Sequence, residues 1–353
     1  MGESARYPAG GLHTFAVRVL ERAGARPEDA RLVADGLVAA DLRGVHTHGV
    51  LRLGIYVTRL EHGSFRSDAT MAVVQDRGPV VLVDAGHGLG IAMAMRAMDL
   101  AIERARRHGV GVVGVRRSSH CGMLAHLAMR AVIDRMIGVA LSNADAQVAP
   151  WGARSRLLGT NPLAVAVPAG AEPPLVLDMA TSVVPHSRIQ AAAAKGERIP
   201  VGWALDAEGR PTESPQDALR GALLTFGGAK GSGLSLMIDV LAGLLTGALP
   251  GSEITPLYER LDAHQGLGHV LAALSVDAFG PAEAFAARVD DLIRQVRALP
   301  PSEGSLRPFV PGEIEHLRAE EYARHGIPLP PQVRDEIERL AGALDVAPPA
   351  PSA

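Results

Sequence analysis

Apolar residues recur at two spacings along the chain, and the spacing changes near residue 73. Between residues 13 and 44 they lie three or four apart, as Ala30, Val33 and Leu37 do, which is typical of amphipathic helices. Beyond residue 73, short β-branched runs alternate with glycines, which is typical of strands. We expect strands at residues 80–83, 110–115, 137–141, 163–167 and 175–177.

Helical spacing returns between and after these strands. We expect helices over residues 91–109, 123–135 and 233–247. Residues 234–249 are nearly all apolar, but they include Asp239 and fall short of the ~20 residues that span a bilayer. We therefore expect a buried helix there, and the alternation of strands and helices predicts an α/β fold.

Polar amphipathic helix returns after Pro281, so the helical segments at the two ends of the chain are expected to form one discontinuous domain. The expected organisation is a helical part over 1–75, an α/β domain over 76–280, a second helical part over 281–345 and a disordered tail over 346–353.

Composition narrows the class of protein. The chain has 353 residues, 47% of them hydrophobic, and 35 basic against 38 acidic residues give a net charge of −3. Without a basic field, neither nucleic acid nor an anionic membrane is an expected partner. Because Cys121 has no intramolecular partner and the N-terminus lacks an apolar signal segment, we expect a cytoplasmic protein.

The turn after the first long strand invites a dinucleotide-binding interpretation. Gly86, Gly88 and Gly90 follow residues 80–83 and precede a helix. A Rossmann fingerprint that starts at Gly86 needs its third glycine where Ile91 stands. The spacing therefore favours a turn that lets helix and strand pack closely.

Residues 41–52 end a helix and bring hydroxyl, imidazole and guanidinium groups together. Arg52 is a suitable bidentate partner for a carboxylate, and Thr47 can orient or tune His48. Such a cluster is also compatible with structural caps or surface polar groups.

His120 lies directly after a predicted strand, where α/β proteins place their sites. Because the ordinary pKa of histidine is near 6.5, it can exchange a proton with a carbonyl or alcohol oxygen near neutral pH. The alternative is that His120 only caps the following helix.

Further polar groups follow other expected strands. Asn143, Asp145 and Thr160 are expected to face the same cleft and to contact a substrate. Residues 224–233 form a glycine-rich turn with Lys230 before an apolar helix, which favours phosphate binding, although a plain turn with a solvated lysine stays open.

Taken together, these segments resemble the malate/L-lactate dehydrogenase-like family, which is unrelated to the Rossmann-fold enzymes of similar name. The matching motifs are Arg43-Gly44, Ala149-Pro150-Trp151-Gly152, Gly159-Thr160-Asn161-Pro162, Asp178-Met179-Ala180-Thr181-Ser182, Gly202-Trp203-Ala204, Gly227-Gly228-Ala229-Lys230-Gly231 and Pro311-Gly312-Glu313. The resemblance implies a homodimer with a three-layer, mixed-sheet α/β cofactor domain and a discontinuous helical domain. It also implies hydride transfer between NAD or NADP and C2 of a small 2-oxo or 2-hydroxy acid.

The resemblance also assigns roles to residues. His120 matches the acid/base histidine, and His48 with Thr47 matches a second, relay pair. Arg52 matches the ligand of the substrate carboxylate. The positions implied to contact the cofactor are His120, Cys121, Gly122, Met123, Leu124, Asp178, Met179, Ala180, Gly228 and Lys230.

Three departures from the family pattern bear on specificity. Thr47 replaces the usual serine but keeps the hydroxyl. Ala229 and Ser232 stand where members often carry aromatic residues. After His186, where some members have Asp or Lys, this chain has Ser187-Arg188. Arg188 could reach a 2′-phosphate, so NAD and NADP both stay open.

The sequence is also compatible with three alternative functions. Reduction of a cyclic imino acid would use the same cofactor and the same site. The His46-Thr47-His48 pair suggests a metal-dependent hydrolase, although it follows a helix and lacks further ligands in sequence. A cofactor-binding protein without catalysis is the third alternative.

Overall fold

The computed structural model describes residues 5–352. Its strands are β1 (Arg6–Tyr7), β2 (Ala72–Asp76), β3 (Val80–Asp84), β4 (Val110–Ser118), β5 (Met136–Ser142), β6 (Leu163–Val167), β7 (Leu175–Met179), β8 (Ala204–Leu205), β9 (Ala222–Leu223), β10 (Leu267–Ser275) and β11 (Ile327–Pro328). Its α-helices are α1 (Ala9–Arg22), α2 (Pro27–Leu42), α3 (Leu53–Glu61), α4 (Gly90–His108), α5 (Leu124–Val132), α6 (His186–Lys195), α7 (Pro215–Arg220), α8 (Ala229–Ile238), α9 (Ala282–Arg297), α10 (Glu313–His325) and α11 (Pro331–Leu344). Short 3-10 turns are η1 (His46–His48), η2 (Val50–Arg52) and η4 (Val276–Ala278), and η3 (Asp239–Leu244) continues α8 as a π-helix.

Seven strands form one mixed sheet in the order β2-β3-β4-β10-β5-β6-β7. Only β3 and β4 are parallel, as the α4 crossover between them requires, and the other pairs are antiparallel. The five strands expected from the sequence are confirmed. The central strand β10 was missed, because its Gly, Ala and His residues give it a weak β signal although it is buried between β4 and β5.

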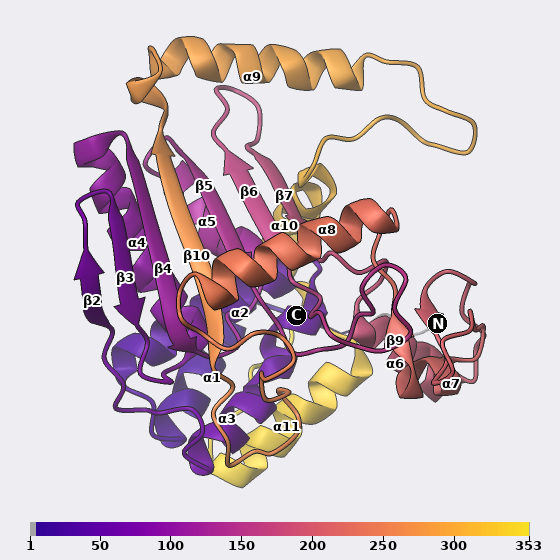
Figure 1. The fold of residues 1–353 in the computed structure, drawn as a ribbon. Helices are drawn as coiled ribbons and strands as arrows, with labels where there is room; N and C mark the ends of the chain where they lie inside the picture. Colours follow the sequence, from indigo (N-terminus) through magenta and orange to yellow (C-terminus); the bar gives the residue numbers. More distant parts are fainter. Residues whose placement is uncertain (1–4, 353) are drawn as a thin grey trace.

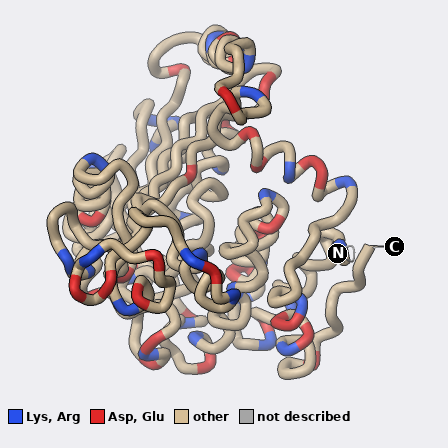
Figure 2. The backbone as a smooth tube through the Cα atoms, turned by 90° about the vertical axis from the view of Figure 1, so that its right-hand side faces the viewer, with Lys and Arg blue, Asp and Glu red and all other residues tan. Residues whose placement is uncertain are grey.

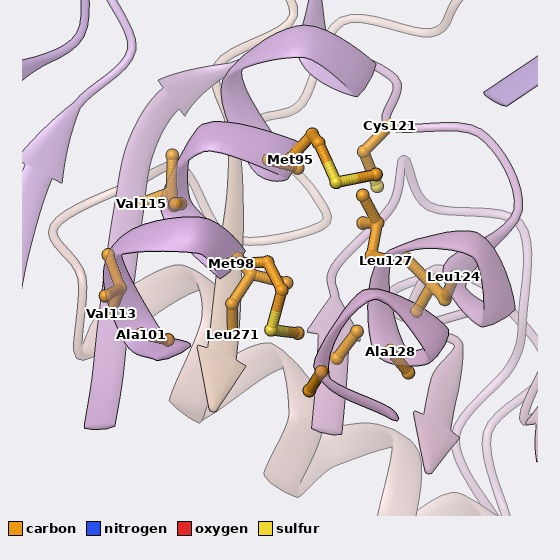
Figure 3. Packing of buried hydrophobic residues seen from close by; sticks show 14 of the residues in the cluster. Met95, Met98, Ala101, Val113, Val115, Cys121, Leu124, Leu127, Ala128 and Leu271 are labelled. Carbon is orange, nitrogen blue, oxygen red and sulfur yellow. The ribbon is translucent and has the colours of Figure 1, made fainter. Parts of the chain in front are cut away.

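Helices cover both faces of the sheet. Helices α4 and α5 lie on one face, and α8 with η3 crosses the other (Figure 1). The side chains of α4, α5 and the sheet form one aliphatic core that includes Met95, Met98 and Leu271 (Figure 3). This arrangement confirms the predicted three-layer, mixed-sheet α/β fold.

The turn between β3 and α4 packs against the end of β4. The hydroxyl of Ser119 accepts the N–H of Gly90 at 2.9 Å and donates to the carbonyl of Gly88 at 2.8 Å. A side chain at Gly90 would collide with the carbonyl of Ser119. The glycines therefore allow close packing of helix and strand, as their spacing indicated.

Helix α8 corrects one expectation. The sequence predicts a buried helix over this apolar stretch, but Met237, Leu244 and Leu245 are 50%, 57% and 69% exposed. The stretch is apolar on most of its circumference, and within residues 5–352 only one side of it lies on the sheet. Its outer side is an exposed apolar face, defined by Leu234, Leu236, Met237, Leu241, Leu244 and Leu245 and called the α8 face below.

The helical part of the molecule joins segments from both ends of the chain. Helices α1, α2, α3 and α11 pack around one cluster of buried residues that includes Phe15, Leu37 and Ile337. Strand β1 pairs with β11 in antiparallel fashion. The segment that carries His46–His48 and Val50–Arg52 packs against α2, α3 and α11, and these helices lie beneath the sheet in Figure 1.

Two C-terminal segments lie elsewhere than expected. Helix α9, expected in the helical part over 281–345, packs against the turn between β6 and β7, where Asp290 accepts the N–H groups of Gly170 and Ala171. Figure 1 shows it at the opposite end of the sheet from α1. Residues 346–352, expected as a disordered tail, lie against the N-terminal region. Val346 is buried, and Ser352 donates its N–H to Arg6 O at 2.7 Å.

Basic and acidic residues are interspersed along the backbone tube of Figure 2, in line with the near balance of charges in the sequence. Among the described residues no helix combines the length and the apolar character that crossing a membrane requires.

Candidate active site

Two histidines from distant parts of the chain meet where the helical part of the molecule contacts the sheet. The rings of His48 and His120 stack with centroids 5.6 Å apart and an interplanar angle of 19°. The hydroxyl of Thr47 lies 3.1 Å from Nδ1 of His48. The structure therefore brings the three residues predicted as catalytic into one cluster.

The turn that carries His48 is wrapped around a buried carboxylate. Asp41, at the end of α2, accepts the N–H of Val50 at 2.7 Å and contacts Nδ1 of His46 at 2.8 Å. A side chain at Gly49 would collide with this carboxylate. Burial raises the pKa of Asp41 above its ordinary value, and the bonds from His46 and Val50 oppose that rise. The turn stacks His48 on His120, whereas His46 contacts Asp41 and stacks on Tyr322, so the two imidazoles of this turn have different partners.

His120 is fixed from three sides at the end of β4. Its Nδ1 lies 2.7 Å from the hydroxyl of Tyr56 and 3.4 Å from the N–H of Gly122, and its own N–H donates to Oε1 of Gln265 at 3.0 Å. Burial raises the pKa of Tyr56 far above its usual range, so its hydroxyl stays protonated. Nδ1 is therefore occupied by protein, and Nε2 is the nitrogen left for proton exchange.

Burial and a neighbouring cation set the protonation of both histidines. Burial, followed by the charge of Arg52, lowers the pKa of His48 to about 4. Burial, Arg52, His48 and His269 together lower the pKa of His120 well below its ordinary value. Both imidazoles are therefore neutral at pH 7 while Arg52 carries no anion. An anion on Arg52 would offset its charge and make protonation of both rings easier.

Arg52 is held at the rim of this cluster. Its Nε donates to the carbonyl of Thr47 at 2.7 Å, and its Nη1 donates to the hydroxyl of Tyr258. The guanidinium lies 5.5 Å from the centroid of the Tyr258 ring. Since the Nε side is used internally, the outer Nη1 and Nη2 groups are the part of Arg52 that can meet a substrate anion.

The structure gives the other predicted substrate ligands different positions. Asn143 is only 1% exposed, and its amide is used within the protein by Asp239, the carbonyl of Leu249 and the N–H of Gly268. It therefore holds the strand ends together and offers no free group. Asp145 accepts from Nε2 of Gln147.

Thr160 is bonded to Thr181, next to the predicted cofactor segment 178–180. Its carbonyl accepts both the N–H of Thr181, at 2.8 Å, and the hydroxyl of the same residue, at 2.9 Å. This pair joins the segment after β5 to the segment after β7.

Hydrogen bonds connect the three segments that were predicted to contact a cofactor. The carboxylate of Asp178 accepts the N–H of Ala125, in the first turn of α5, at 2.7 Å, which links 120–124 to 178–180. The N–H of Phe226 donates to the carbonyl of Thr181 at 3.0 Å and links that segment to the Gly228 turn. Segments far apart in sequence are thus connected by hydrogen bonds.

Within 120–124 the main chain is what a ligand can reach. The side chains of Cys121, Met123 and Leu124 belong to the aliphatic core, and burial raises the pKa of the Cys121 thiol to about 12. Gly122 has a φ of 74°, and a side chain there would press on Ile91. These side chains therefore fix the course of the backbone beside His120.

At the next segment, desolvation raises the pKa of the Asp178 carboxyl to about 6, although one side of the residue is open to solvent. Met179 and Ala180 are half-buried beside it. Arg43, which is 7% exposed, stabilises the charged form of Asp178 from the end of α2.

The turn before α8 fits an anionic group. Gly227 and Gly228 have φ values of 58° and 60°, and Lys230 in the first turn of the helix is exposed. Within the described chain, Lys230 has no ion pair and the N–H of Ala229 has no acceptor. Arg188, at the start of α6, is also exposed and lies 5.4 Å from the centroid of the Trp203 ring.

Sequence reasoning missed Tyr56, Tyr258 and Gln265. Tyr56 had a usable signal, because it follows Arg52 by four residues and so lies on the same face of the helical segment. Tyr258 and Gln265 had none, since they lie on an irregular loop whose path depends on tertiary contacts.

Comparison with known proteins agrees with this architecture. A family model described as malate/L-lactate dehydrogenase matches residues 8–338. The chain is 36% identical to malate dehydrogenase of Pyrococcus abyssi, over 97% of this chain and 95% of the relative. It is 38% identical to L-sulfolactate dehydrogenase of Methanothermobacter thermautotrophicus, over 90% and 91% of the two chains. Other relatives are named as dehydrogenases that use NAD(+) or NADP(+).

Solved structures show the same likeness. Malate dehydrogenase from Pyrococcus horikoshii OT3 matches with a TM-score of 0.90 and 34% identity, over 99% of this chain and 98% of that one. Delta1-piperideine-2-carboxylate reductase from Pseudomonas syringae matches with a TM-score of 0.86 and 31% identity, over 97% and 99%. The family suggested by the motifs is thus confirmed over nearly the whole chain. This protein belongs to the malate/L-lactate dehydrogenase family.

Proposed function

We propose that the protein is an NAD(P)-dependent oxidoreductase that transfers a hydride between the cofactor and C2 of a small 2-oxo or 2-hydroxy acid. The observation that carries this proposal is the stack of His48 on His120 beside the outward guanidinium of Arg52. A carboxylate ligand and a proton-exchanging imidazole next to it are what a 2-oxo acid requires.

In this function Arg52 binds and orients the substrate carboxylate. The C2 oxygen then faces Nε2 of His120, the nitrogen that Tyr56 and Gly122 leave free. The hydroxyl of Tyr56 can donate to Nδ1 or accept from it, so it supports the ring in either protonation state. His48, whose Nδ1 contacts the hydroxyl of Thr47, lies on the other side of His120 and relays protons in this proposal.

Substrate binding also favours protonation of His120. The charge of Arg52 is the second-largest cause of the low pKa of both histidines. A carboxylate on Arg52 offsets that charge, so a bound acid raises the pKa of His120 when a proton for the C2 oxygen is needed. The enzyme thereby keeps a neutral imidazole when empty and favours the imidazolium when loaded.

The residues present fit a nicotinamide cofactor. The connected segments 120–124, 178–180 and 228–230 would hold it, with Lys230 and the start of α8 as the place for an anionic group. When bound, the nicotinamide supplies or accepts the hydride. In this proposal Arg188, which lies beside Trp203, binds a phosphate on the ribose, and named relatives use either NAD(+) or NADP(+).

Reduction of a cyclic imino acid is the second candidate. It is supported by the match to a solved delta1-piperideine-2-carboxylate reductase. Such a substrate carries the same carboxylate and presents an imine nitrogen where a 2-oxo acid presents its oxygen. The same histidine and arginine would therefore serve both.

We also propose that the protein forms a homodimer through the α8 face. Six large apolar side chains on one helix are partly or largely exposed in the single chain. A contiguous apolar patch of this kind marks an interaction surface. The relationship to this family makes a second copy of the chain the expected occupant.

Reduced-nicotinamide absorbance tests the proposed activity. Purified protein is offered NADH or NADPH with a panel of 2-oxo acids and cyclic imines, beside a His120→Ala control. We expect cofactor oxidation that requires the acid and falls by about 100-fold or more in the control. Cofactor binding without turnover of any panel member would instead favour a binding protein without catalysis.

A further inference from the structure

The loop between η3 and β10, residues 249–266, supplies two side chains to the candidate site. Gln265 accepts the N–H of His120, and Tyr258 accepts a hydrogen bond from Arg52. The loop has no regular secondary structure of its own. Its position beside Arg52 therefore depends on contacts with the rest of the molecule.

Arg59 of α3 supplies those contacts. Its side chain is completely buried, and its guanidinium donates to four carbonyls of the loop. The four acceptors are Leu257 O at 2.8 Å, Pro256 O at 2.7 Å, Glu259 O at 2.9 Å and Ala263 O at 2.9 Å. Ser64 Oγ accepts a further bond at 3.1 Å. Two of the anchored carbonyls belong to the residues on either side of Tyr258, so Arg59 fixes the backbone from which the phenol projects.

The phenol of Tyr258 is placed to donate as well as to accept. Its side chain is 61% exposed, and its oxygen accepts from Nη1 of Arg52. Its own proton has no acceptor among residues 5–352. An unused O–H thus stands next to the outward N–H groups of Arg52. Together they form a donor set that complements a carboxylate.

We propose that Tyr258 is a second ligand of the substrate carboxylate, donating its O–H to one carboxylate oxygen while Arg52 donates to the same group. Arg59 is the positioning residue that holds Tyr258 there through the loop backbone. This inference rests on the proposed function, because it assigns the recognition of the acid group in that same site.

The first test is Tyr258→Phe, which keeps the ring over Arg52 and removes the hydroxyl, that is, both the unused donor and the acceptor of the Arg52 bond. With the best 2-oxo acid of the panel, we expect KM to rise by about tenfold, while kcat stays within about twofold and the KM for the reduced nicotinamide is unchanged. Tyr7→Phe is the matched control, because it removes the same hydroxyl from a tyrosine of β1, which pairs with β11. It should leave all three constants unchanged.

A second readout separates carboxylate recognition from general damage. The ratio of kcat/KM for the acid to that for its uncharged amide should fall about tenfold in Tyr258→Phe, because only the acid has a carboxylate to lose. In Arg59→Met, which releases the loop, the further change Tyr258→Phe should lower the acid-to-amide ratio little more. Arg59→Lys should keep part of the acid preference that Arg59→Met loses. An unchanged or lower KM in Tyr258→Phe, with the acid-to-amide ratio intact, would overturn the proposal even if Arg59→Met fails to fold.

Calorimetry with oxamate, an unreactive analogue of a 2-oxo acid, keeps the two proposals apart. If the wild-type protein turns over no acid, the proposed function fails, but about tenfold weaker oxamate binding by Tyr258→Phe would still support the carboxylate ligand. Equal oxamate affinity in both proteins, or no binding to the wild type, would refute it.

Discussion

The hydroxyl of Tyr56 and Nδ1 of His120 lie 2.7 Å apart, although 64 residues separate them in sequence. The bond joins α3 to the end of β4, and it leaves Nε2 of His120 as the nitrogen that can exchange a proton. The orientation of the proposed acid/base group is therefore set by a residue from the other part of the fold.

Replacement of Tyr56 by phenylalanine should reduce kcat more than it changes KM. The substitution removes the partner of Nδ1 but keeps the ring packed against Phe65. We expect kcat to fall about 10- to 100-fold, since the hydrogen bond supports a group that becomes charged. Steady-state kinetics with Tyr7→Phe as a distant control checks this. An effect confined to KM would show that Tyr56 only shapes the pocket.

The protonation of His48 should respond to anions on Arg52. Because burial and Arg52 hold its pKa at about 4, His48 is neutral above that pH in the free protein. A carboxylate ligand should raise this pKa, and Arg52→Gln should do the same without ligand. Histidine-labelled protein followed by NMR through a pH titration, with and without oxamate, measures both. A pKa that stays the same in all three samples would contradict the proposed linkage.

The same reasoning fixes the pH dependence of activity. Reduction of a 2-oxo acid needs a protonated His120, whose pKa in the free protein is well below its ordinary value. The kcat/KM for reduction should therefore rise as the pH falls from 8 toward 5, and that for oxidation of the hydroxy acid should rise in the opposite direction. Parallel profiles for the two directions would exclude a single proton-exchanging group.

Asp41 should be important both for stability and for the site. Its buried carboxylate binds His46 and the N–H of Val50, so Asp41→Asn should lower the free energy of unfolding by about 1–3 kcal/mol. Activity should fall further than the loss of folded protein explains, because the turn that holds His48 is released. Urea unfolding and kinetics measure the two effects. Asp68→Asn, which breaks only an exposed pair with Arg66, is the control and should cost less than about 1 kcal/mol.

The α8 face should control the oligomeric state. Light scattering after size-exclusion chromatography should give twice the chain mass of 36.9 kDa for the wild type. Leu241→Glu with Leu245→Glu should give the single mass, because two charges at the interface are too costly to bury. Leu306→Glu, a similarly exposed leucine outside the face, should leave the mass unchanged. A wild-type protein of single mass would remove the dimer proposal.

Arg188 should influence the choice of cofactor. Its exposed guanidinium, near Trp203, is the proposed ligand of a 2′-phosphate. Arg188→Ala should lower kcat/KM for NADPH by about tenfold and leave NADH within about twofold. Trp203 remains in place as an internal reference for the fold of this segment, through its fluorescence. Equal effects on both cofactors would show that Arg188 does not discriminate between them.

The sequence was most informative where residues interact with near neighbours in the chain. The strands at 80–83 and 110–115 and the helix that joins them follow from local periodicity alone. The central strand β10 did not, because its identity depends on being paired on both sides by β4 and β5. The α8 stretch is apolar in the way a buried helix is, and the sequence alone does not say that one chain leaves it uncovered.

The same distinction applies to the candidate site. His48, Arg52 and His120 were identified because each stands in a short motif with recognisable chemistry. Asn143 stood in an equally suitable place after a strand, but the structure uses its amide to hold strand ends together. Tyr258 stands in no motif at all, since its place beside Arg52 is created by Arg59, almost 200 residues earlier in the chain.

The buried guanidinium of Arg59 is surrounded by oxygen atoms much as a calcium ion is surrounded in a metal-stabilised loop. Here the cation is covalently attached to a helix and cannot be removed by chelation. The cation that anchors the loop beside the site is thus part of the fold of α3.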